Sequence, residues 1–165
     1  MKRIGKGLGG AESAALAGLI GAAYGATAII LAPLSYGPVQ VRISEALTVL
    51  PYLFPRAVPG LFIGCLIANF VGGYGILDAI LGSGATLAAG LLSARMPNAW
   101  LASLPPVFIN MFVVGGYLSF LLDMPFLACA LYVGLGQTVA CCFLGIPLAL
   151  YLERRMKKGG DSPAR

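Results

Sequence analysis

Long hydrophobic runs, broken by prolines and glycines, are the feature that most limits what this chain can fold into. The first run opens at Glu12 and Ser13, continues to about Ala32 and stops at Pro33. A helix of about 20 apolar residues spans the hydrocarbon core of a bilayer, which is roughly 30 Å thick. A membrane β-barrel requires short segments of alternating polar and apolar residues instead. The runs here do not alternate, so they predict membrane-spanning helices.

Composition excludes a water-soluble domain. Only 10% of the 165 residues are charged and 59% are hydrophobic, whereas a soluble domain carries about a quarter charged residues. The 23 glycines would weaken a soluble helical bundle, but in a membrane glycine lets helices approach one another closely. We therefore expect an all-α integral membrane protein, surrounded by lipid and without a nucleic-acid partner.

Turn-forming residues divide the hydrophobic part of the chain into six expected membrane crossings. The second crossing begins near Ser44 and is kept short or bent by Pro51 and Pro55, because proline cannot continue a regular helix. The other five are expected at about 12–32, 58–71, 76–94, 99–122 and 126–151.

The basic residues predict the orientation and the domain boundaries. Six crossings place both termini on the same side of the membrane. With that side in the cytoplasm, only Arg42 of the 11 Lys and Arg residues lies outside, in agreement with the positive charge of cytoplasmic loops. We expect basic cytoplasmic tails at 1–10 and 153–165, a six-helix transmembrane domain over 11–152, and a loop at 34–45 on the outer face.

The stretch from Leu34 to Pro55 concentrates polar side chains between two hydrophobic segments. Gly37 and Pro38 predict a turn or loop at its beginning. Its polar residues are Tyr36, Gln40, Arg42, Ser44 and Glu45. Arg42 and Glu45 share one face if a helix begins near Ser44, where they either clasp each other or meet a solute.

Polar residues in the other helices are predicted at overlapping depths in the outer half of the bundle. Such residues are costly in lipid and tend to face a cavity or a partner, so we predict a pocket there, closed from above by the polar loop. The candidate substrate-binding residues are Tyr36, Gln40, Arg42, Glu45, Asn69, Tyr74, Asp78, Asn110 and Gln137. Structural roles remain open for several of them: interhelical hydrogen bonds for the amides, a helix N-terminal charge for Asp78, and a position in the interfacial belt for Tyr74, as for Trp100.

Small residues recur at every fourth position of the first helix. One stripe is formed by Ala14, Gly18, Ala22 and Ala26. A second, adjacent stripe is formed by Ala17, Gly21 and Gly25. Stripes of this kind let another helix approach closely. The partner is either a helix of the same chain or another subunit.

Catalytic and metal-binding patterns are missing from the sequence. It contains no His, and its four Cys residues lie in apolar runs without CxxC spacing. We expect no metal, no cofactor and no enzymatic activity. No phosphate-binding loop of the GxxxxGK[ST] type is present, so any ATP hydrolysis belongs to partner subunits. A stand-alone secondary carrier, which would need internal repeats and an embedded ionisable relay, is an alternative, as is a structural membrane protein without a solute.

The motif SYGPVQVRISEALTVLPYLFP, followed by PGLFIGCLIANFVGGYGILD, resembles the QueT family, and the similarity extends over nearly the whole hydrophobic chain. The resemblance implies the substrate-binding S component of an energy-coupling factor (ECF) transporter, an ABC importer for queuosine precursors in the prokaryotic plasma membrane. It implies six helices with both termini inside, and association with a membrane coupling subunit and two ATPases. It also implies that the stripe beginning at Ala14 is the docking surface, with Gly18 in place of one Ala.

The implied solute is a 7-deazaguanine-type base, although an S component for another vitamin-like solute remains an alternative. Such a base presents N–H donors beside a carbonyl, and Glu45 is the first candidate to accept two N–H bonds. The three candidate amides supply mixed donors and acceptors, while Tyr36 or Tyr74 would contact the planar ring. Arg42 would bond the carbonyl or hold the carboxylate in place. Asp78 would pair with an aminomethyl group.

Overall fold

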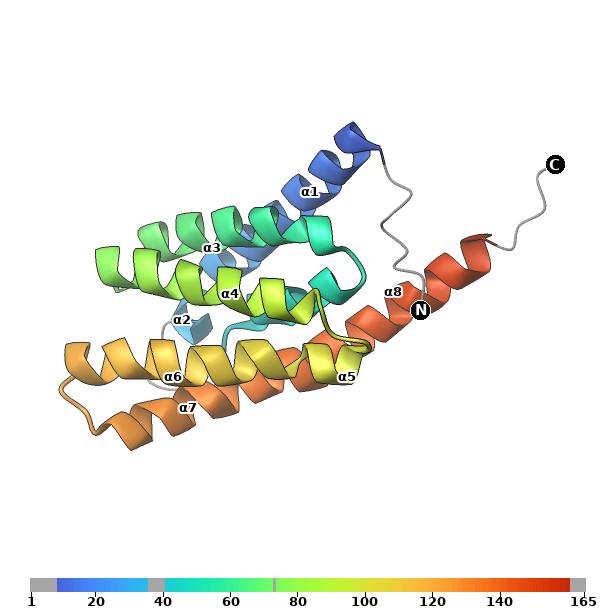
Figure 1. The fold of residues 1–165 in the computed structure, drawn as a ribbon. Coiled ribbons are helices and arrows are strands. Elements are labelled where there is room, and N and C mark those ends of the chain that lie inside the picture. Colours follow the sequence, from blue (N-terminus) through green and yellow to red (C-terminus); the bar gives the residue numbers. More distant parts are fainter. Residues whose placement is uncertain (1–8, 36–40, 73, 161–165) are drawn as a thin grey trace.

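Figure 1 shows a computed structural model of the chain, which describes residues 9–35, 41–72 and 74–160, with side chains through Lys158. Within these ranges every regular element is a helix. In chain order the elements are α1 (Gly10–Ile30), α2 (Ala32–Ser35), the 3₁₀ helices η2 (Ile43–Tyr52) and η3 (Pro55–Ala57), α3 (Val58–Gly72), the π-helix η4 (Asp78–Gly82), α4 (Ser83–Ser93), α5 (Ala99–Ala102), α6 (Leu104–Leu121), α7 (Phe126–Thr138), the π-helix η5 (Val139–Gly145) and α8 (Ile146–Gly160).

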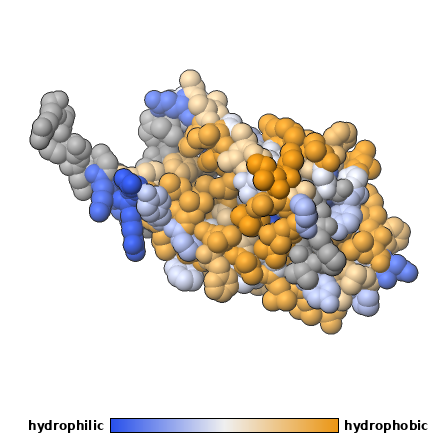
Figure 2. All heavy atoms as spheres, turned by 180° about the vertical axis from the view of Figure 1, so that it is seen from behind, coloured by the Kyte–Doolittle hydropathy of each residue, from blue (hydrophilic) through white to orange (hydrophobic). Residues whose placement is uncertain are grey.

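The surface of the bundle is apolar in the way that a lipid environment requires. Large side chains such as Phe120, Ile30 and Phe70 are 85%, 77% and 76% exposed, which a soluble protein rarely tolerates over a contiguous area. Figure 2 shows hydrophobic residues over most of the face seen from behind, with the most hydrophilic residues gathered near the ends. The predicted all-α architecture is therefore confirmed, and the apolar surface agrees with a membrane protein.

Four described helical stretches are long and apolar enough to cross a membrane: Gly10–Ile30, Pro55–Gly72, Ala99–Leu121 and Phe126–Lys158. The fourth expected crossing corresponds to a shorter apolar helix, Asp78–Ser93, and the second to the ten residues of η2. Six crossings therefore remain a prediction. The start of α1 and the end of α8 lie at the same end of the bundle, and the turn between α6 and α7 lies at the opposite end (Figure 1).

The second segment is short, as its prolines predict, and it is wound as a 3₁₀ helix with Pro51 inside it. A 3₁₀ run of ten residues is unusual, because its hydrogen-bond geometry is poorer than that of an α-helix. Close packing of neighbouring elements holds it in place. A Cβ atom at Gly145 of η5 would lie 2.7 Å from Val49 Cγ2 and 2.9 Å from Ala46 O, so glycine at this position lets η5 lie directly against η2.

Helices α1 and α3 approach each other through glycine. A Cβ atom at Gly60 would lie 1.9 Å from Ala17 O, and one at Gly64 would lie 2.2 Å from Gly21 O. Contacts as close as these leave no room for a side chain, which is the geometry that small-residue stripes permit in membranes. The inner stripe of Ala17, Gly21 and Gly25 is therefore used within the protein, against α3.

The last helix is longer than the sequence pattern predicts. It continues to Gly160 rather than ending near Tyr151, and partly buried Leu152 and Met156 pack against the main core. Side-chain pairs one turn apart support the charged part: Lys157 Nζ lies 2.7 Å from Glu153 Oε1, and Arg155 Nε donates to Tyr151 Oη at 3.0 Å. Such pairs stabilise a helix and explain why it extends into the basic segment.

Candidate functional site

Buried polar side chains from α1, η2 and α6 meet at the carboxylate of Glu45. The Tyr24 hydroxyl of α1 donates a hydrogen bond to Glu45 Oε1, and Asn110 Nδ2 of α6 donates to Glu45 Oε2 at 3.4 Å. Tyr24 is fully buried, while Glu45 and Asn110 are each 1% exposed. A 3₁₀ helix places Glu45 in its first turn, three residues after Arg42, so both side chains enter the bundle from the same end of η2.

Arg42, which directly precedes η2, is also buried. Its Nη2 donates to Asn69 Oδ1 on α3 and lies 3.9 Å from Cys65 Sγ. Hydrogen bonds from the first turn of η2 therefore reach α3 through Arg42, and α1 and α6 through Glu45. These bonds anchor the segment to separate helices, which goes beyond the simple clasp between Arg42 and Glu45 that the spacing allowed.

Cys65 joins the surroundings of the guanidinium and the carboxylate into one network. The Tyr24 hydroxyl lies 3.4 Å from Cys65 Sγ, Asn69 Nδ2 lies 3.5 Å from it, and Thr86 Oγ1 lies 3.3 Å from it. All four side chains are buried. The polar groups of α1, α3 and α4 thus face the same region of the interior as Arg42 and Glu45.

A second carboxylate, Asp78, lies at the start of the π-helix η4. The Tyr117 hydroxyl donates to Asp78 Oδ1, and the Tyr74 backbone N–H donates to Oδ2 at 3.3 Å. Asn69 Nδ2 donates to the backbone oxygen of Asp78 at 2.9 Å, which connects this carboxylate to the Arg42 side of the network. Asp78 is therefore both a charge at a helix start and a buried polar group facing other helices, and short π-helices are frequent at functional sites.

Glycine at position 82 allows this convergence. A Cβ atom there would lie 2.7 Å from Asn69 Nδ2, 2.8 Å from Asp78 Oδ1 and 3.3 Å from the Tyr117 hydroxyl. The polar side chains occupy the space that any larger residue would need. A helix that presents bare backbone at this point lets the groups of α3, η4 and α6 come together.

Charged side chains are uncommon in the interior of a membrane protein, but this network contains them. Among the described residues, the buried charged side chains are Arg42, Glu45 and Asp78. Ionisable groups inside membrane helices are costly and usually mark a binding site or pathway. Two carboxylates share the region with one guanidinium, so the site favours a ligand that offers hydrogen-bond donors or positive charge.

Some hydrogen-bonding capacity in the site is unused. Within the described part of the chain, Asn110 Oδ1 and Ser44 Oγ are buried without a hydrogen-bond partner. An unsatisfied buried polar atom costs about 1–3 kcal/mol. Asn110 Oδ1 belongs to the amide that bonds Glu45 Oε2, so an unpaired acceptor lies directly beside the carboxylate.

The structure brings five of the predicted site residues into this one network: Arg42, Glu45, Asn69, Asp78 and Asn110. Tyr74 is half-buried at its edge. Gln137 of α7 is also buried. Its Oε1 lies 3.5 Å from Cys141 Sγ, and that thiol also reaches the Glu45 carbonyl at 3.5 Å. Tyr36 and Gln40 lie outside the described residues. The binding roles of all these residues stay predictions.

Several members of the network were not predicted from the sequence: Tyr24, Cys65, Gly82, Thr86 and Tyr117. The two tyrosines are the most consequential, because each hydroxyl donates to a buried carboxylate. A signal was available, since a tyrosine in the middle of an apolar helix needs a partner for its hydroxyl. It did not say on which helix that partner lies.

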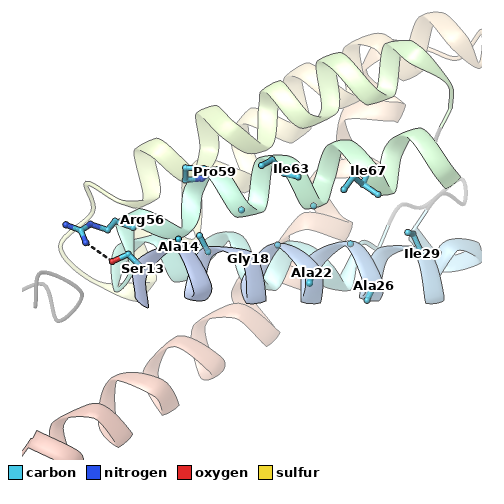
Figure 3. A pocket seen from close by; sticks show the side chains of 15 residues that line it. Ser13, Ala14, Gly18, Ala22, Ala26, Ile29, Arg56, Pro59, Ile63 and Ile67 are labelled. Atoms are coloured by element: carbon cyan, nitrogen blue, oxygen red, sulfur yellow. Dashed lines mark hydrogen bonds between the residues drawn. The ribbon is translucent and has the colours of Figure 1, made fainter. Parts of the chain in front are cut away.

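The outer small-residue stripe of α1 lines a groove, shown in Figure 3. Its residues Ala14, Gly18, Ala22 and Ala26 are all exposed. Ile63 and Ile67 of α3 form the opposite wall of the groove, whose volume is about 720 Å³. A Cβ atom at Gly18 would meet nothing within 4 Å. The structure thus separates the two stripes, with one packed against α3 and the other open.

Two comparisons with known proteins identify the same family. The sequence model described as the QueT transporter matches residues 14–154. A protein of Lactococcus lactis subsp. cremoris (strain MG1363), named queuosine precursor transporter QueT, is 31% identical over 140 residues, covering 76% of this chain and 82% of the relative. No solved structure gave a significant match.

Proposed function

The chain belongs to the QueT transporter family, and from that premise we propose that it captures a queuosine precursor from outside the cell. The name of the relative from Lactococcus lactis indicates a queuosine precursor, and in this proposal the precursor is a 7-deazaguanine-type base. In this proposal the chain is the substrate-binding S component of an ECF-type importer. The observation that carries it is the buried network around Glu45 and Asn110, within a bundle whose surface is apolar.

The chemistry of the network suits the pyrimidinone edge of such a base. The edge offers N–H donors beside a carbonyl acceptor. The Glu45 carboxylate accepts N–H bonds and is oriented by the Tyr24 hydroxyl. The Asn110 amide carries both a donor and an unpaired acceptor beside it. The contact from Asn110 to Glu45 is long, at 3.4 Å, so a ligand N–H replaces it at little cost.

The second carboxylate addresses the substituent of the base. An aminomethyl group is positively charged at neutral pH and would pair with Asp78, which the Tyr117 hydroxyl orients. Tyr74 lies beside Asp78 and would supply an aromatic contact to the ring. Arg42, held by Asn69, would bond the ring carbonyl. Tyr36, Gln40 and Gln137 are proposed as additional contacts from the loop and from α7.

Capture from outside follows from the proposed topology. Six crossings with both termini in the cytoplasm agree with the shared position of the start of α1 and the end of α8 (Figure 1), and with a basic excess at that end. The transmembrane solute-binding domain covers 11–152, between basic tails at 1–10 and 153–165. The loop before η2 is then on the outer side and gives access to the site.

Energy for import comes from partner subunits in this proposal, because the sequence carries no phosphate-binding loop. We place the membrane coupling subunit in the groove along α1, against Ala14, Gly18, Ala22 and Ala26. This exposed stripe is free to receive a closely packed helix, since the neighbouring stripe is already used by α3. Two cytoplasmic ATPases would act on the coupling subunit.

Titration calorimetry of the purified chain with a 7-deazaguanine base tests the binding step. We expect saturable binding of this base. We expect much weaker binding of hypoxanthine, because it lacks the exocyclic amine. Uptake into vesicles tests the transport step, with the coupling subunit, the ATPases and ATP supplied or omitted in turn. Uptake by the chain alone would identify a secondary carrier, and failure to bind any deazaguanine would reject the proposed solute class.

A further inference from the structure

A second groove lies where η5 and α8 pass α5, away from the polar network. Its volume is about 540 Å³, and its walls include Trp100, Phe143, Ile146, Leu150, Tyr151 and Arg154. Trp100 and Phe143 are 66% and 71% exposed, so these two wall side chains remain open to the surroundings, whereas Ile146 is buried. Neither the proposed substrate site nor the groove along α1 uses these residues.

The groove is apolar along its length and cationic at one end. Phe143, Ile146 and Leu150 line it before Arg154 closes it near the basic end of α8. The eleven steps from Phe143 to Arg154 correspond to about 16 Å of helix at 1.5 Å per residue. That length is close to half of the roughly 30 Å hydrocarbon core, so the groove is about as long as one leaflet of a bilayer is thick.

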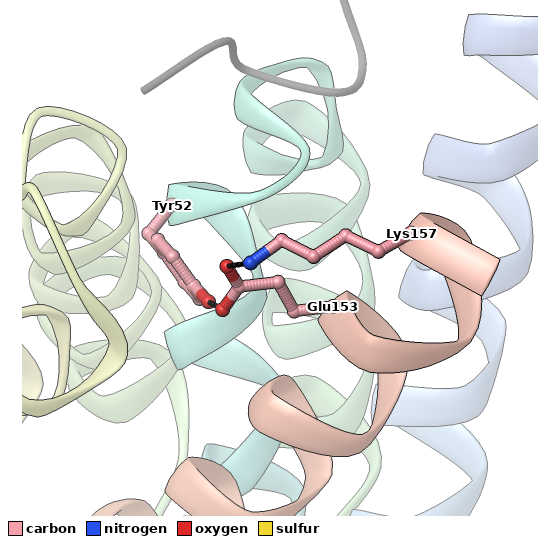
Figure 4. Close-up of polar contacts among 3 residues, drawn as sticks. All are labelled: Tyr52, Glu153 and Lys157. Atoms are coloured by element: carbon pink, nitrogen blue, oxygen red, sulfur yellow. Dashed lines mark hydrogen bonds and ion pairs between the residues drawn. The ribbon is translucent and has the colours of Figure 1, made fainter. Parts of the chain in front are cut away.

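The cation at the end of the groove is available to an anion. Arg154 is exposed, and across residues 9–35, 41–72 and 74–160 its side chain takes part in no hydrogen bond or ion pair. The neighbouring carboxylate of Glu153 is directed elsewhere: it accepts from Tyr52 at 2.6 Å and from Lys157 at 2.7 Å (Figure 4). Arg154 is therefore not neutralised by its neighbour.

A second cation lies beside the same wall. The Arg155 guanidinium lies 5.6 Å from the centre of the Tyr151 ring, and its Nε donates to the Tyr151 hydroxyl. Tyr151 itself lines the groove. The ring contact orients Arg155 but leaves its charge in place, because a cation held over an aromatic face remains positively charged. Two positive charges thus lie at the polar end of this apolar groove.

We propose that this groove binds an anionic phospholipid, with an acyl chain along Phe143 and Leu150 and the headgroup phosphate at Arg154. Charge complementarity and the length of one leaflet are the grounds for this occupant. Guanidinium groups bind phosphate oxygens well because several N–H donors are held in a planar fork. Anionic lipids are enriched in the cytoplasmic leaflet, and the basic end of α8 is the end assigned to the cytoplasm by charge.

The only tryptophan in the chain provides the test, because Trp100 lines the groove. The full chain is reconstituted into phosphatidylcholine vesicles that contain increasing amounts of a lipid brominated on its acyl chain, either phosphatidylglycerol or phosphatidylcholine. Quenching of Trp100 fluorescence by the bromine atoms is measured. We expect brominated phosphatidylglycerol to give the same quenching at about one fifth of the mole fraction that brominated phosphatidylcholine requires. A difference of this size is the scale for one cation at an anionic surface.

Two matched variants identify the cation. Arg154→Gln is expected to reduce the preference for phosphatidylglycerol, whereas Arg95→Gln, which removes another exposed arginine outside the groove, is expected to retain it in full. Both change an exposed side chain, and size-exclusion chromatography checks that each variant is folded. Equal quenching by the two lipids in the unaltered chain would overturn the proposal. So would a preference that Arg154→Gln leaves undiminished, or one that Arg95→Gln reduces to the same extent.

Discussion

The hydroxyl of Tyr24 donates a hydrogen bond to the carboxylate of Glu45 in the middle of the bundle. Tyr24 belongs to α1, whose outer face carries the exposed small-residue stripe, and Glu45 belongs to the first turn of η2. The helix proposed to dock the coupling subunit is thus bonded directly to the carboxylate proposed to hold the solute. A displacement of α1 would change the position or the bonding of Glu45, which offers a physical route between the two proposed functions.

Replacing Glu45 with Gln is expected to weaken binding of a deazaguanine base by roughly 1.5–3 kcal/mol, the scale for a hydrogen bond to a charged group. The amide keeps the shape of the side chain but replaces one acceptor oxygen with a donor. Titration calorimetry measures the loss. Asp123→Asn, a similar change in an exposed turn, is the control and should bind as the unaltered chain does. Unchanged affinity in Glu45→Gln would remove this residue from the site.

Tyr24→Phe tests whether the orientation of that carboxylate matters. The substitution removes the hydroxyl and keeps the ring, so Glu45 loses a hydrogen bond worth about 1.5–3 kcal/mol and becomes less well oriented. Base affinity is expected to fall by about tenfold, and the melting temperature to decrease. Tyr132→Phe, a partly exposed tyrosine on α7, is the control. An affinity equal to that of the control would show that the carboxylate needs no orientation by Tyr24.

Gly82→Ala is expected to destabilise the protein by about 1–3 kcal/mol, the range for an overpacked interior. The added Cβ would lie 2.7 Å from Asn69 Nδ2 and 2.8 Å from Asp78 Oδ1, so the polar network would have to spread. Gly84→Ala is a close control two residues away, because a Cβ there meets nothing within 4 Å. Thermal unfolding in detergent compares the two. Equal melting temperatures would mean that the network adapts to the methyl group at no cost.

Gly18→Leu is expected to leave base binding unchanged and to block transport. The leucine side chain would point into the open groove along α1 and keep a partner helix from close approach. Calorimetry on the chain alone and uptake by the complete transporter separate these two effects. Gly21→Leu is the contrasting variant: a Cβ at Gly21 would lie 2.4 Å from Gly60 O, so this change should disrupt folding. Normal uptake with Gly18→Leu would place the docking surface elsewhere.

The segmentation of this chain is readable in its sequence. The turn at Asp123 and Pro125 and the proline at 55 separate helices near the predicted positions, because proline and turn residues act locally and in any environment. Arg42 and Glu45 were also predicted as site residues, because ionisable groups are conspicuous in a hydrophobic sequence. The structure brings them together with Asn69, Asp78 and Asn110 in one network, and the depth of these residues in the membrane stays a prediction.

The sequence by itself determined that the chain is a helical membrane protein with its polar chemistry near the start of η2. Only the tertiary structure decided which helix faces are internal: that Gly21 and Gly25 turn toward α3 while Gly18 stays open, and that Tyr24 and Tyr117 meet the two carboxylates. The physical reason is that lipid and protein interior are both apolar. Hydrophobic periodicity, which reveals the inner face of a helix in water, therefore carries little information about the inner face of a helix in a membrane.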